Sequence, residues 1–387
     1  MDLPWPHVVL SLMGALPSCA HSVVGQDAAH RGAPAVGEVV DELGSQIWVV
    51  FQGRDLSFWF GSDGEGLYRF DGETLVRFTT EHGLVGNHIR GIQEDRSGNI
   101  YVSTEPAGVS RFDGRTFTTL SALEPAQSEW RLAPEDLWFS CGQDTGAVYR
   151  YDGERLHHLA FPKSEAGEEH IARHPRSQFP NAKYSPYDVY TIFKDSRGHV
   201  WFGTAVLGAC RYDGTSHAWI AEPGRELGSF GTRAIIEDRA GHFWFSSVKE
   251  RYVVDGGDVA GRGAHALRYR VEEGLVADGL SVFNSALLDR NGHLWLTTLG
   301  SGVWRDDGRS VTHYPVLHEG ASIWVYSIYS DREGTLWLGT QEHGVYRFHE
   351  GAFERVRRPS RRCTPRIRLA PVWGKGSPTR AFPGRRD

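Results

Sequence analysis

The stretch "DREGTLWLGT", residues 331–340, decides the fold, because the chain repeats its pattern. Each copy has an Asp, a Gly three residues later and an aromatic residue six positions after the Asp. Four more copies are "DRSGNIYVST" from residue 95, "DSRGHVWFGT" from 195, "DRAGHFWFSS" from 238 and "DRNGHLWLTT" from 289. A pattern that returns with fixed internal spacing indicates a repeat architecture.

Each copy is typical of a turn followed by a buried strand. The Asp side chain can accept hydrogen bonds from turn amides, and the Gly can adopt a positive φ without penalty. The aromatic residue leads a short apolar run of strand length. Another short strand precedes the turn, as in "HIRGIQE" (88–94), and two more follow the apolar run, mostly joined by an Asp-Gly hairpin signal such as 113–114. Each unit is therefore predicted to be a four-stranded antiparallel meander.

Counting the aromatic residue of the second strand predicts seven units. These aromatics are Trp59, Tyr101, Trp138, Trp201, Trp244, Trp295 and Trp337. A small residue follows two positions later in every unit, on the same strand face: Gly61, Ser103, Ser140, Gly203, Ser246, Thr297 and Gly339. Small residues let a neighbouring sheet approach closely. We therefore expect an all-β fold, a seven-bladed β-propeller of four-stranded antiparallel blades over residues 45–356.

Composition and charge support a globular body with a different C-terminus. The chain has 387 residues, 40% of them hydrophobic, and a net charge of −6. Residues 357–387 hold ten Lys or Arg and one Asp, so the remaining 356 residues carry about −15. An acidic body argues against nucleic acid as a partner. Residues 357–387 are predicted to be a disordered basic tail, because they combine Pro, Gly and charge without any period.

The N-terminus is predicted to be an export segment, either a signal peptide or a lipoprotein segment. Residues 1–22 contain a short apolar run, "VVLSLMGAL", followed by small residues, which favours a signal peptide and a periplasmic or extracellular location. Cys19 follows Leu16, Pro17 and Ser18, an order similar to a lipoprotein cleavage box, so a lipid anchor through Cys19 stays open. The n-region lacks Lys and Arg, which counts against export. Residues 23–44 are predicted to be a linker, and no apolar run is long enough for a transmembrane segment.

The repeat resembles the two-component regulator propeller repeat, found in the extracytoplasmic sensor halves of bacterial hybrid histidine kinases. The pattern "NHIRGIQEDRSGNIYVST…GVSRFDGRTFTTL", from residue 87, carries the resemblance, and "FTTEHGLVGNHI" is similar to the family's connector between blades. The units around residues 59, 138 and 244 depart from the pattern. No kinase, receiver or Ig-like segment follows. The resemblance therefore implies signal transduction by sensing or ligand binding, without a catalytic output in this chain.

Two insertions interrupt the repeat. Residues 162–186 are extra between the third and fourth units, and residues 250–268 are extra in the fifth. Long loops on a rigid scaffold often carry binding residues. His170 and His174 would share a helix face and could hold a metal, but no third ligand is evident, so no metal is predicted.

The mouth of the central channel is the predicted binding site. The start of the first strand, seven and five residues before the turn Asp, holds polar or aromatic residues, whereas Ile follows further along. The predicted site residues are His88, Arg90, Asp188, Tyr190, Arg233, Asn284, Trp324 and Tyr326. Such a ring suits a small polar ligand such as a carbohydrate. The alternative is that these side chains only bond to loops and water around the axis.

No catalytic constellation is evident. The sequence lacks a Gly-x-Ser-x-Gly elbow, a P-loop and a dinucleotide fingerprint, so neither a cofactor nor an enzymatic activity is predicted. Two alternatives stay open. One is a propeller lyase resembling virginiamycin B lyase, for which His88 is the only plausible general base. The other is a scaffold that binds a protein partner.

Overall fold

The computed structural model describes residues 36–105, 108–143, 145–175, 177, 185–220, 231–259 and 265–357. The predicted signal segment and the tail from residue 358 onward lie outside these described residues. No helix within them is long and apolar enough to cross a membrane.

The strands form groups that follow one another along the chain. The first two groups are β2 (Ile47–Gln52), β3 (Phe58–Ser62), β4 (Leu67–Phe70) and β5 (Leu75–Phe78), then β6 (His88–Glu94), β7 (Ile100–Glu105), β8 (Val109–Phe112) and β9 (Phe117–Thr119). The third contains β10 (Ala122–Leu123), β11 (Leu137–Ser140), β12 (Ala147–Tyr151) and β13 (Leu156–Ala160). The fourth contains β14 (Val189–Lys194), β15 (Val200–Thr204), β16 (Ala209–Tyr212) and β17 (His217–Ile220).

The remaining groups continue in the same order. The fifth contains β18 (Ile235–Glu237), β19 (His242–Phe245), β20 (Glu250–Val259) and β21 (His265–Glu273). The sixth contains β22 (Ser285–Leu288), β23 (Leu294–Thr297), β24 (Val303–Asp306) and β25 (Val311–Tyr314). The hairpin of β26 (Leu317–His318) and β27 (Ala321–Ser322) leads to the seventh, which contains β28 (Val325–Ser330), β29 (Leu336–Thr340), β30 (Val345–His349) and β31 (Ala352–Val356).

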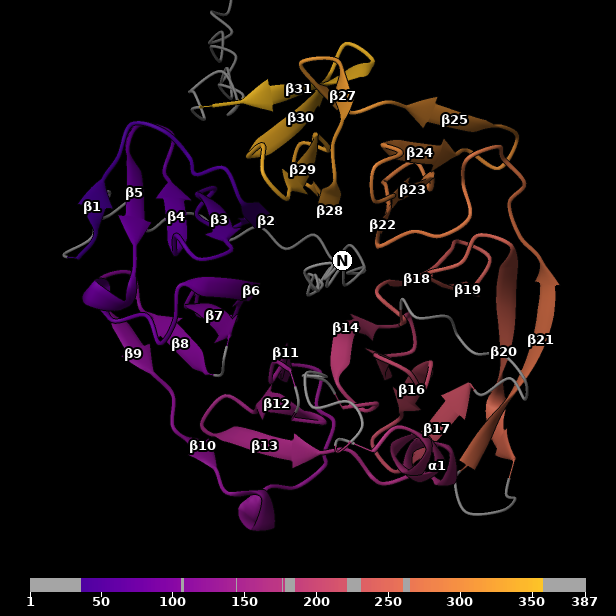
Figure 1. Cartoon of the computed structure of the whole chain (residues 1–387). Helices are drawn as coiled ribbons and strands as arrows, with labels where there is room; N and C mark the ends of the chain where they lie inside the picture. Colours follow the sequence, from indigo (N-terminus) through magenta and orange to yellow (C-terminus); the bar gives the residue numbers. More distant parts are fainter. Residues whose placement is uncertain are drawn as a thin grey trace, which may run out of the picture.

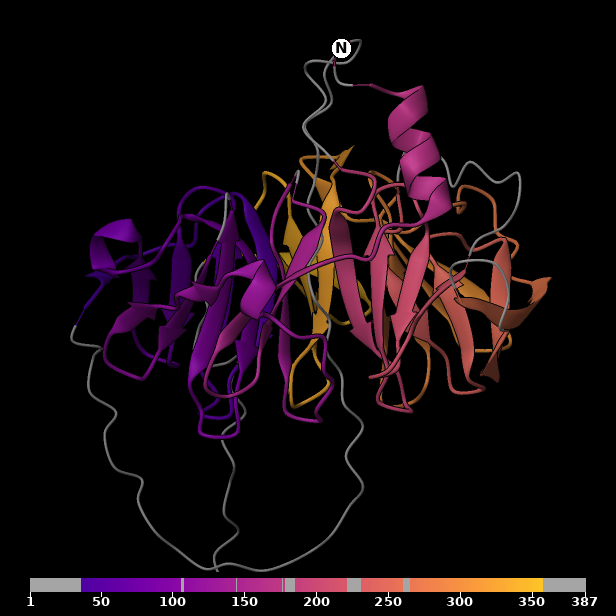
Figure 2. The same ribbon diagram turned by 90° about the horizontal axis from the view of Figure 1, so that it is seen from below.

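The groups are arranged around a central axis, as in a β-propeller (Figure 1). The first strands β2, β6, β14, β18, β22 and β28 lie nearest the axis, and those of consecutive groups contact each other wherever both are present. Seen from the side, the sheets form a disc, and helix α1 (Glu165–Arg173) stands above one face (Figure 2). Because α1 lies in the connection that leads into β14, this is the face on which the first strands begin. Apart from α1, the helical structure of the described residues is two short 3-10 segments, Thr80–His82 and Pro125–Gln127.

The third group corrects the prediction of four antiparallel strands in every unit. It has three, β11 to β13, and its fourth strand, β10, pairs with β13 in parallel. The chain between β10 and β11 contains a 3-10 turn that starts at Pro125 instead of a first strand. Trp130 of this segment packs outward against Tyr212 and His217 of the fourth group. The strand carrying Trp138 is therefore the innermost of its group and contacts both β6 and β14.

The fifth group corrects a second expectation. The extra residues 250–268 belong largely to strands rather than to a binding loop, because they lengthen β20 and β21 into a long hairpin. The hairpin also joins two groups, since β21 pairs in parallel with β17 of the fourth group.

The first and last groups meet without exchanging a strand. β2 pairs with β29 at Ile47 and Thr340, and Gln52 accepts a hydrogen bond from the amide of Arg332 at 3.0 Å. β31 stays with its own group by pairing with β30. β1 (Glu38–Val39), within the segment predicted to be a linker, adds to the outer edge of β5. Residues 36–46 add no strand to the last group, although Gly344 donates its amide hydrogen bond to the carbonyl oxygen of Ser45 at 2.6 Å.

The turn Asp explains the fixed spacing of the repeat. In the fourth group, Asp195 Oδ1 accepts hydrogen bonds from the amides of Arg197 (3.0 Å) and His199 (2.8 Å). Its Oδ2 accepts one from Trp201 Nε1 at 2.9 Å, so the carboxylate ties the turn to the aromatic ring. We call this arrangement the turn clamp. The other clamped pairs are Asp95 with Tyr101 (3.0 Å), Asp238 with Trp244 (3.2 Å), Asp289 with Trp295 (2.9 Å) and Asp331 with Trp337 (2.8 Å).

The packing of the aromatic and small positions confirms the close approach of neighbouring groups. All seven aromatics are at most 3% exposed. A Cβ added to Gly203 would lie 2.4 Å from the carbonyl oxygen of Thr232, on the next group. Gly61 and Gly339 face the next first strand at similarly short distances. A larger side chain at these positions would push the groups apart.

Candidate functional site

Six equivalent positions, in or just before the first strands, form one layer around the axis. They stand eleven residues before the second-strand aromatic, and the third group has no strand at this position. The residues are Trp48, Arg90, Tyr190, Arg233, Asn284 and Tyr326. Five of them are at most 6% exposed, and the side chain of the sixth, Arg90, is 9% exposed. The layer therefore combines three aromatic rings with two buried guanidinium groups.

Trp48 joins the residues of the first, second and last groups. Its ring lies 4.5 Å from the ring of Tyr326, and the guanidinium of Arg90 sits over it at 4.6 Å from the centroid. Cation–π contact with Trp stabilises a guanidinium that has lost water. Burial raises the pKa of Tyr326 above its usual range, although the charges of Arg233 and Arg90 partly oppose the shift. Tyr326 therefore stays a neutral hydroxyl at neutral pH.

On the other side of the layer, Arg233 stacks over the ring of Tyr190 at 4.8 Å. Burial lowers the pKa of Arg233, and the nearby Tyr190 and Tyr326 oppose this shift. Asn284 donates from Nδ2 to the carbonyl oxygens of Val325 (2.8 Å) and Tyr326 (3.2 Å), so this side chain links the sixth and seventh groups.

An ionic cluster lies above the layer at the start of β6. Asp63 Oδ1 is 2.8 Å from His88 Nδ1 and accepts a hydrogen bond from Arg90 at 2.9 Å. Arg90 also donates from Nε to Glu105 at 2.8 Å. The side chain of His88 is 51% exposed, whereas the side chain of Arg90 is mostly buried. His88 is therefore the most exposed member of this cluster, ahead of Asp63 and Glu105, whose side chains are 21% and 20% exposed.

Two of the predicted site residues, Asp188 and Trp324, lie outside both the layer and the ionic cluster. Asp188 is buried, and its carboxylate accepts hydrogen bonds from the amides of Ser185 (2.8 Å), Thr145 (3.0 Å) and Gly146 (2.9 Å), which fixes the loop that leads into β14. Trp324 is half-buried and lines a cavity of about 270 Å³. The other residues around this cavity are Ser322, Ile323, Gln341, Glu342 and His343. Burial lowers the pKa of His343, and the nearby His318 adds to this shift.

Sequence reasoning missed Trp48, Asp63 and Glu105. Trp48 could have been found only by counting back from Trp59, because the first unit has Gly53 where five other units have the turn Asp. Asp63 directly follows the second strand of the first group, and Glu105 is the last residue of the second strand of the second group. No pattern in the sequence places either beside Arg90, because the contact depends on how two groups pack.

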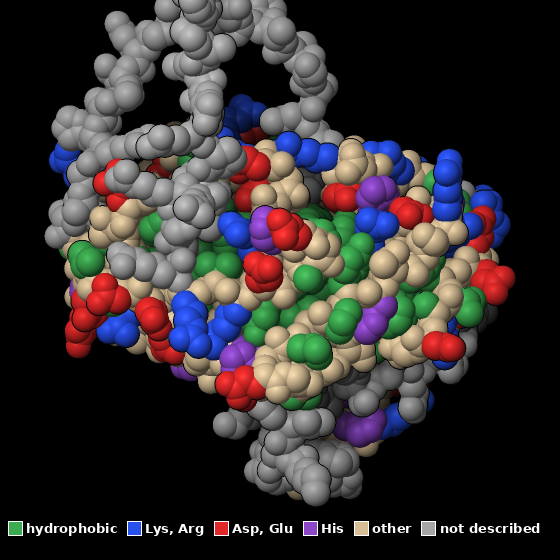
Figure 3. All heavy atoms as spheres, turned by 90° about the horizontal axis from the view of Figure 1, so that it is seen from above, with side chains coloured by type: hydrophobic (Ala, Val, Ile, Leu, Met, Phe, Trp, Pro, Cys, Tyr) green, Lys and Arg blue, Asp and Glu red, His purple; other side chains and the backbone are tan. Residues whose placement is uncertain are grey.

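Residues 165–173 of the insertion before β14 form helix α1, as the spacing of its histidines allows. The rings of His170 and His174 stack at 4.4 Å. No group of three or more His, Cys, Asp or Glu side chains within the described ranges could hold a metal ion. On the side of the molecule drawn in Figure 3, acidic, basic and hydrophobic side chains are interspersed.

The family comparison identifies the repeat. The model of the two component regulator propeller matches residues 83–105, 183–205 and 320–342. Each matched segment covers a first strand, the turn clamp and a second strand. The predicted resemblance is confirmed. A comparison with curated proteins finds no significant match.

Solved structures of similar fold include extracellular domains of putative signalling systems, a lyase and a secretion-system component. The extracellular domain of the putative one component system BT4673 from B. thetaiotaomicron has 20% identity and a TM-score of 0.50, over 80% of this chain and 40% of that domain. Virginiamycin B lyase from Staphylococcus aureus has 11% identity and a TM-score of 0.57, over 80% of this chain and 99% of the lyase. PorZ, a surface component of the type-IX secretion system of Porphyromonas gingivalis, has 16% identity and a TM-score of 0.54, over 79% of this chain and 46% of PorZ. At these identities the likeness shows the propeller fold alone, and this chain spans less than half of the BT4673 domain.

Proposed function

We propose that the chain is a sensory, ligand-binding propeller that acts outside the cytoplasm, with the strand groups forming seven blades of one ring. The layer of aromatic and arginine side chains around the axis carries this proposal. Its rings and guanidiniums come from separate groups and contact each other. The match to the two component regulator propeller supports a sensing role.

The ligand we propose is a small polar molecule such as a carbohydrate, bound at the end of the axis where the first strands begin. His88 and Trp324 are the predicted residues that reach solvent there. An exposed imidazole held by Asp63 can exchange hydrogen bonds with hydroxyl groups, and an indole face can pack against a sugar ring. The more buried Arg90, Tyr190, Arg233, Asn284 and Tyr326 would shape the floor, and Asp188 would hold the rim loop.

A panel of neutral and acidic saccharides tests the ligand class by thermal shift, followed by calorimetric titration of any saccharide that binds. We expect His88→Ala, which removes a polar contact, or Trp324→Ala, which removes a packed indole face, to weaken binding by about tenfold. His349→Ala is a matched control, because His349 is also 51% exposed but lies on β30. Affinity that survives both site variants would place the ligand elsewhere. A panel without any binder would exclude the carbohydrate class.

Export is part of the proposal, with residues 1–22 as the signal segment. Fractionation of cells that express the full chain should place the protein in the periplasm or the medium. Cys19→Ala should release it from membranes if a lipid anchor is present. Retention of the unprocessed chain in the cytoplasm would contradict the proposed location.

A lyase is the second candidate, because His88 is paired with Asp63 at 2.8 Å, as a general base needs to be. Opening of a streptogramin B ring that His88→Asn abolishes would favour this candidate. Capture of a specific protein partner that survives His88→Ala and Trp324→Ala would instead favour an interaction scaffold.

A further inference from the structure

The first group lacks the carboxylate of the turn clamp. Gly53 stands six residues before Trp59, where the clamped groups have Asp. Trp59 is 2% exposed, and its Nε1 has no hydrogen-bond partner among the described residues. A buried indole N–H without an acceptor is costly, because it has lost water without replacement.

The position of the missing side chain adjoins this indole and is partly occupied by Asp55, whose Oδ1 would lie 2.8 Å from a Cβ built on Gly53. A Cβ built on Gly53 would lie 3.5 Å from Trp59 Nε1. Asp55 takes over only part of the missing role, because its Oδ1 accepts from the amide of Ser57 (2.9 Å) and its Oδ2 accepts from Arg69. Neither oxygen bonds to the indole.

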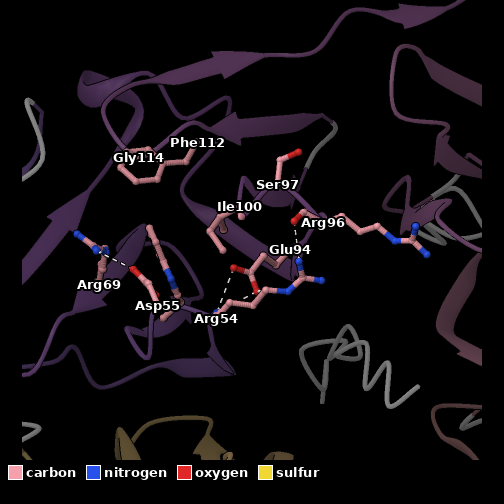
Figure 4. Close-up of a pocket in the computed structure, with 11 residues that line it drawn as sticks. Arg54, Asp55, Arg69, Glu94, Arg96, Ser97, Ile100, Phe112 and Gly114 are labelled. Atoms are coloured by element: carbon pink, nitrogen blue, oxygen red, sulfur yellow. Dashed lines mark hydrogen bonds and ion pairs between the residues drawn. The ribbon is translucent and has the colours of Figure 1, made fainter. Parts of the chain in front are cut away.

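A cavity of about 370 Å³ opens at this point between the first and second groups (Figure 4). Trp59, Arg54, Asp55, Arg69 and Glu94 line it. Figure 4 shows Arg69 bonded to Asp55 on one side and the backbone of Arg54 bonded to Glu94 on the other. Both carboxylates are therefore already engaged. The Arg54 guanidinium donates to the carbonyl oxygen of Arg96 at 2.8 Å and lies 3.8 Å from Glu94, but its side chain is 51% exposed, so the cation also faces the solvent side of the cavity.

We propose that this cavity binds a small carboxylate, one oxygen of which accepts the hydrogen bond of Trp59 Nε1. In four other groups a Trp at the equivalent position meets a carboxylate oxygen at 2.8–3.2 Å. The ligand takes the place that Asp Oδ2 has there, and Arg54 supplies a charge-assisted contact. This site is separate from the axial site, because it lies beside the turns at the ends of the first strands.

Indole NMR tests the proposal with acetate as the probe. In protein labelled with ¹⁵N-tryptophan, the Trp59 resonance is assigned by its loss in Trp59→Phe. We expect acetate to move it downfield, toward the resonance of the clamped Trp201, in a saturable titration. Acetamide, which has the same shape but no charge, should leave it in place. Trp138 is the internal control, because its Nε1 also lacks a partner among the described residues but is packed by Trp130 and Phe202.

Two variants separate the site from non-specific effects. Gly53→Asp should shift the Trp59 resonance without acetate and remove the response to acetate. Its Cβ would approach Asp55 Oδ1 at 2.8 Å, so that carboxylate must move aside. Arg54→Gln, at an exposed side chain, should weaken acetate binding several-fold in a protein that melts normally. The proposal is overturned if Trp59 does not respond to acetate, responds equally to acetamide, or responds unchanged in Arg54→Gln.

Discussion

The fourth and first groups place a tryptophan at the same buried position but support it differently. Trp201 and Trp59 are 0% and 2% exposed, and each faces an Arg on the third strand. Asp195 satisfies two turn amides and the indole of Trp201, whereas Gly53 provides no acceptor for Trp59. Both groups nevertheless form four paired strands. The comparison indicates that burial of the aromatic ring builds a group and that the clamp adds stability to it.

The largest loss of stability should come from removing the buried ring, and it should be similar in both groups. Trp201→Ala and Trp59→Ala each remove a buried indole, and each should lower the free energy of unfolding by about 3–5 kcal/mol. Chemical denaturation monitored by circular dichroism measures both. A Trp59→Ala protein as stable as the wild type would mean that the unclamped ring is not part of the core.

The third group lacks the turn Asp too, and it uses aromatic packing that should make stability pH-dependent. Trp130 and Tyr212 enclose His217, and burial lowers the pKa of His217 to about 4. In the unfolded chain His217 has a pKa of about 6.5, so below this pH the unfolded chain binds a proton at His217 that the folded protein does not bind. The contribution of His217 is therefore fully present above pH 6.5 and lost as the pH falls toward 4.

Between pH 7 and pH 4, we expect the protonation of His217 to lower the free energy of unfolding by at most about 3 kcal/mol, because its pKa differs between the folded and unfolded states. The measurement is urea denaturation across this range, with His217→Phe as the comparison. The variant should show a flatter profile above pH 5, where the carboxylates have not yet titrated. Parallel profiles for the two proteins would show that His217 is not responsible.

The turn clamp should contribute less to the free energy of unfolding than burial of the aromatic ring does. Asp195→Ala leaves two turn amides and an indole without their acceptor, and should cost about 1–2 kcal/mol. Trp201→Phe should lower the free energy of unfolding more than Trp59→Phe does, by a similar amount of about 1–2 kcal/mol, because only Trp201→Phe breaks a hydrogen bond. Double-mutant cycles of Asp195 with Trp201 isolate the pair. Loss of saccharide binding in a stable Asp195→Ala protein would instead make Asp195 a ligand contact.

The repeat spacing predicted most of the fold, because the turn, the ring and the small residue act within one group. The all-β class, the antiparallel meanders and the burial of all seven aromatics followed from residues close in sequence. Two features did not follow from local pattern. The third group loses its first strand because Pro125 starts a 3-10 turn, and β21 joins β17 through pairing between groups.

The candidate site was predicted less completely, for the same reason. The first-strand spacing identified Arg90, Tyr190, Arg233 and Tyr326, and the structure brings these into one layer with Trp48. Asp63, which holds His88 and Arg90, belongs to the neighbouring group. Contacts between groups depend on the angle at which sheets pack, and a single repeat does not encode that angle.

The smallest effect concerns the backbone of the turn. Leu56 occupies the place of the turn Gly and has φ 67°, whereas Gly198 has φ 86° in the fourth group. A left-handed conformation costs an L-residue about 1–2 kcal/mol, and Gly avoids this cost but loses more chain entropy on folding. Leu56 is 39% exposed, so its removal forfeits little burial. Leu56→Gly should therefore raise the free energy of unfolding by about 0.5–1 kcal/mol.

Gly198→Leu is the matched reverse change. A Cβ on Gly198 meets no atom within 4 Å, so backbone strain is the only expected cost, and we expect a loss of about 1 kcal/mol. Both proteins are compared with the wild type by thermal melting and urea denaturation. If Leu56→Gly destabilises the protein while Gly198→Leu does not, the Leu56 side chain contributes packing that outweighs its strain. Positions 53–56 and 195–198 would then share the same chain path but be stabilised by different interactions.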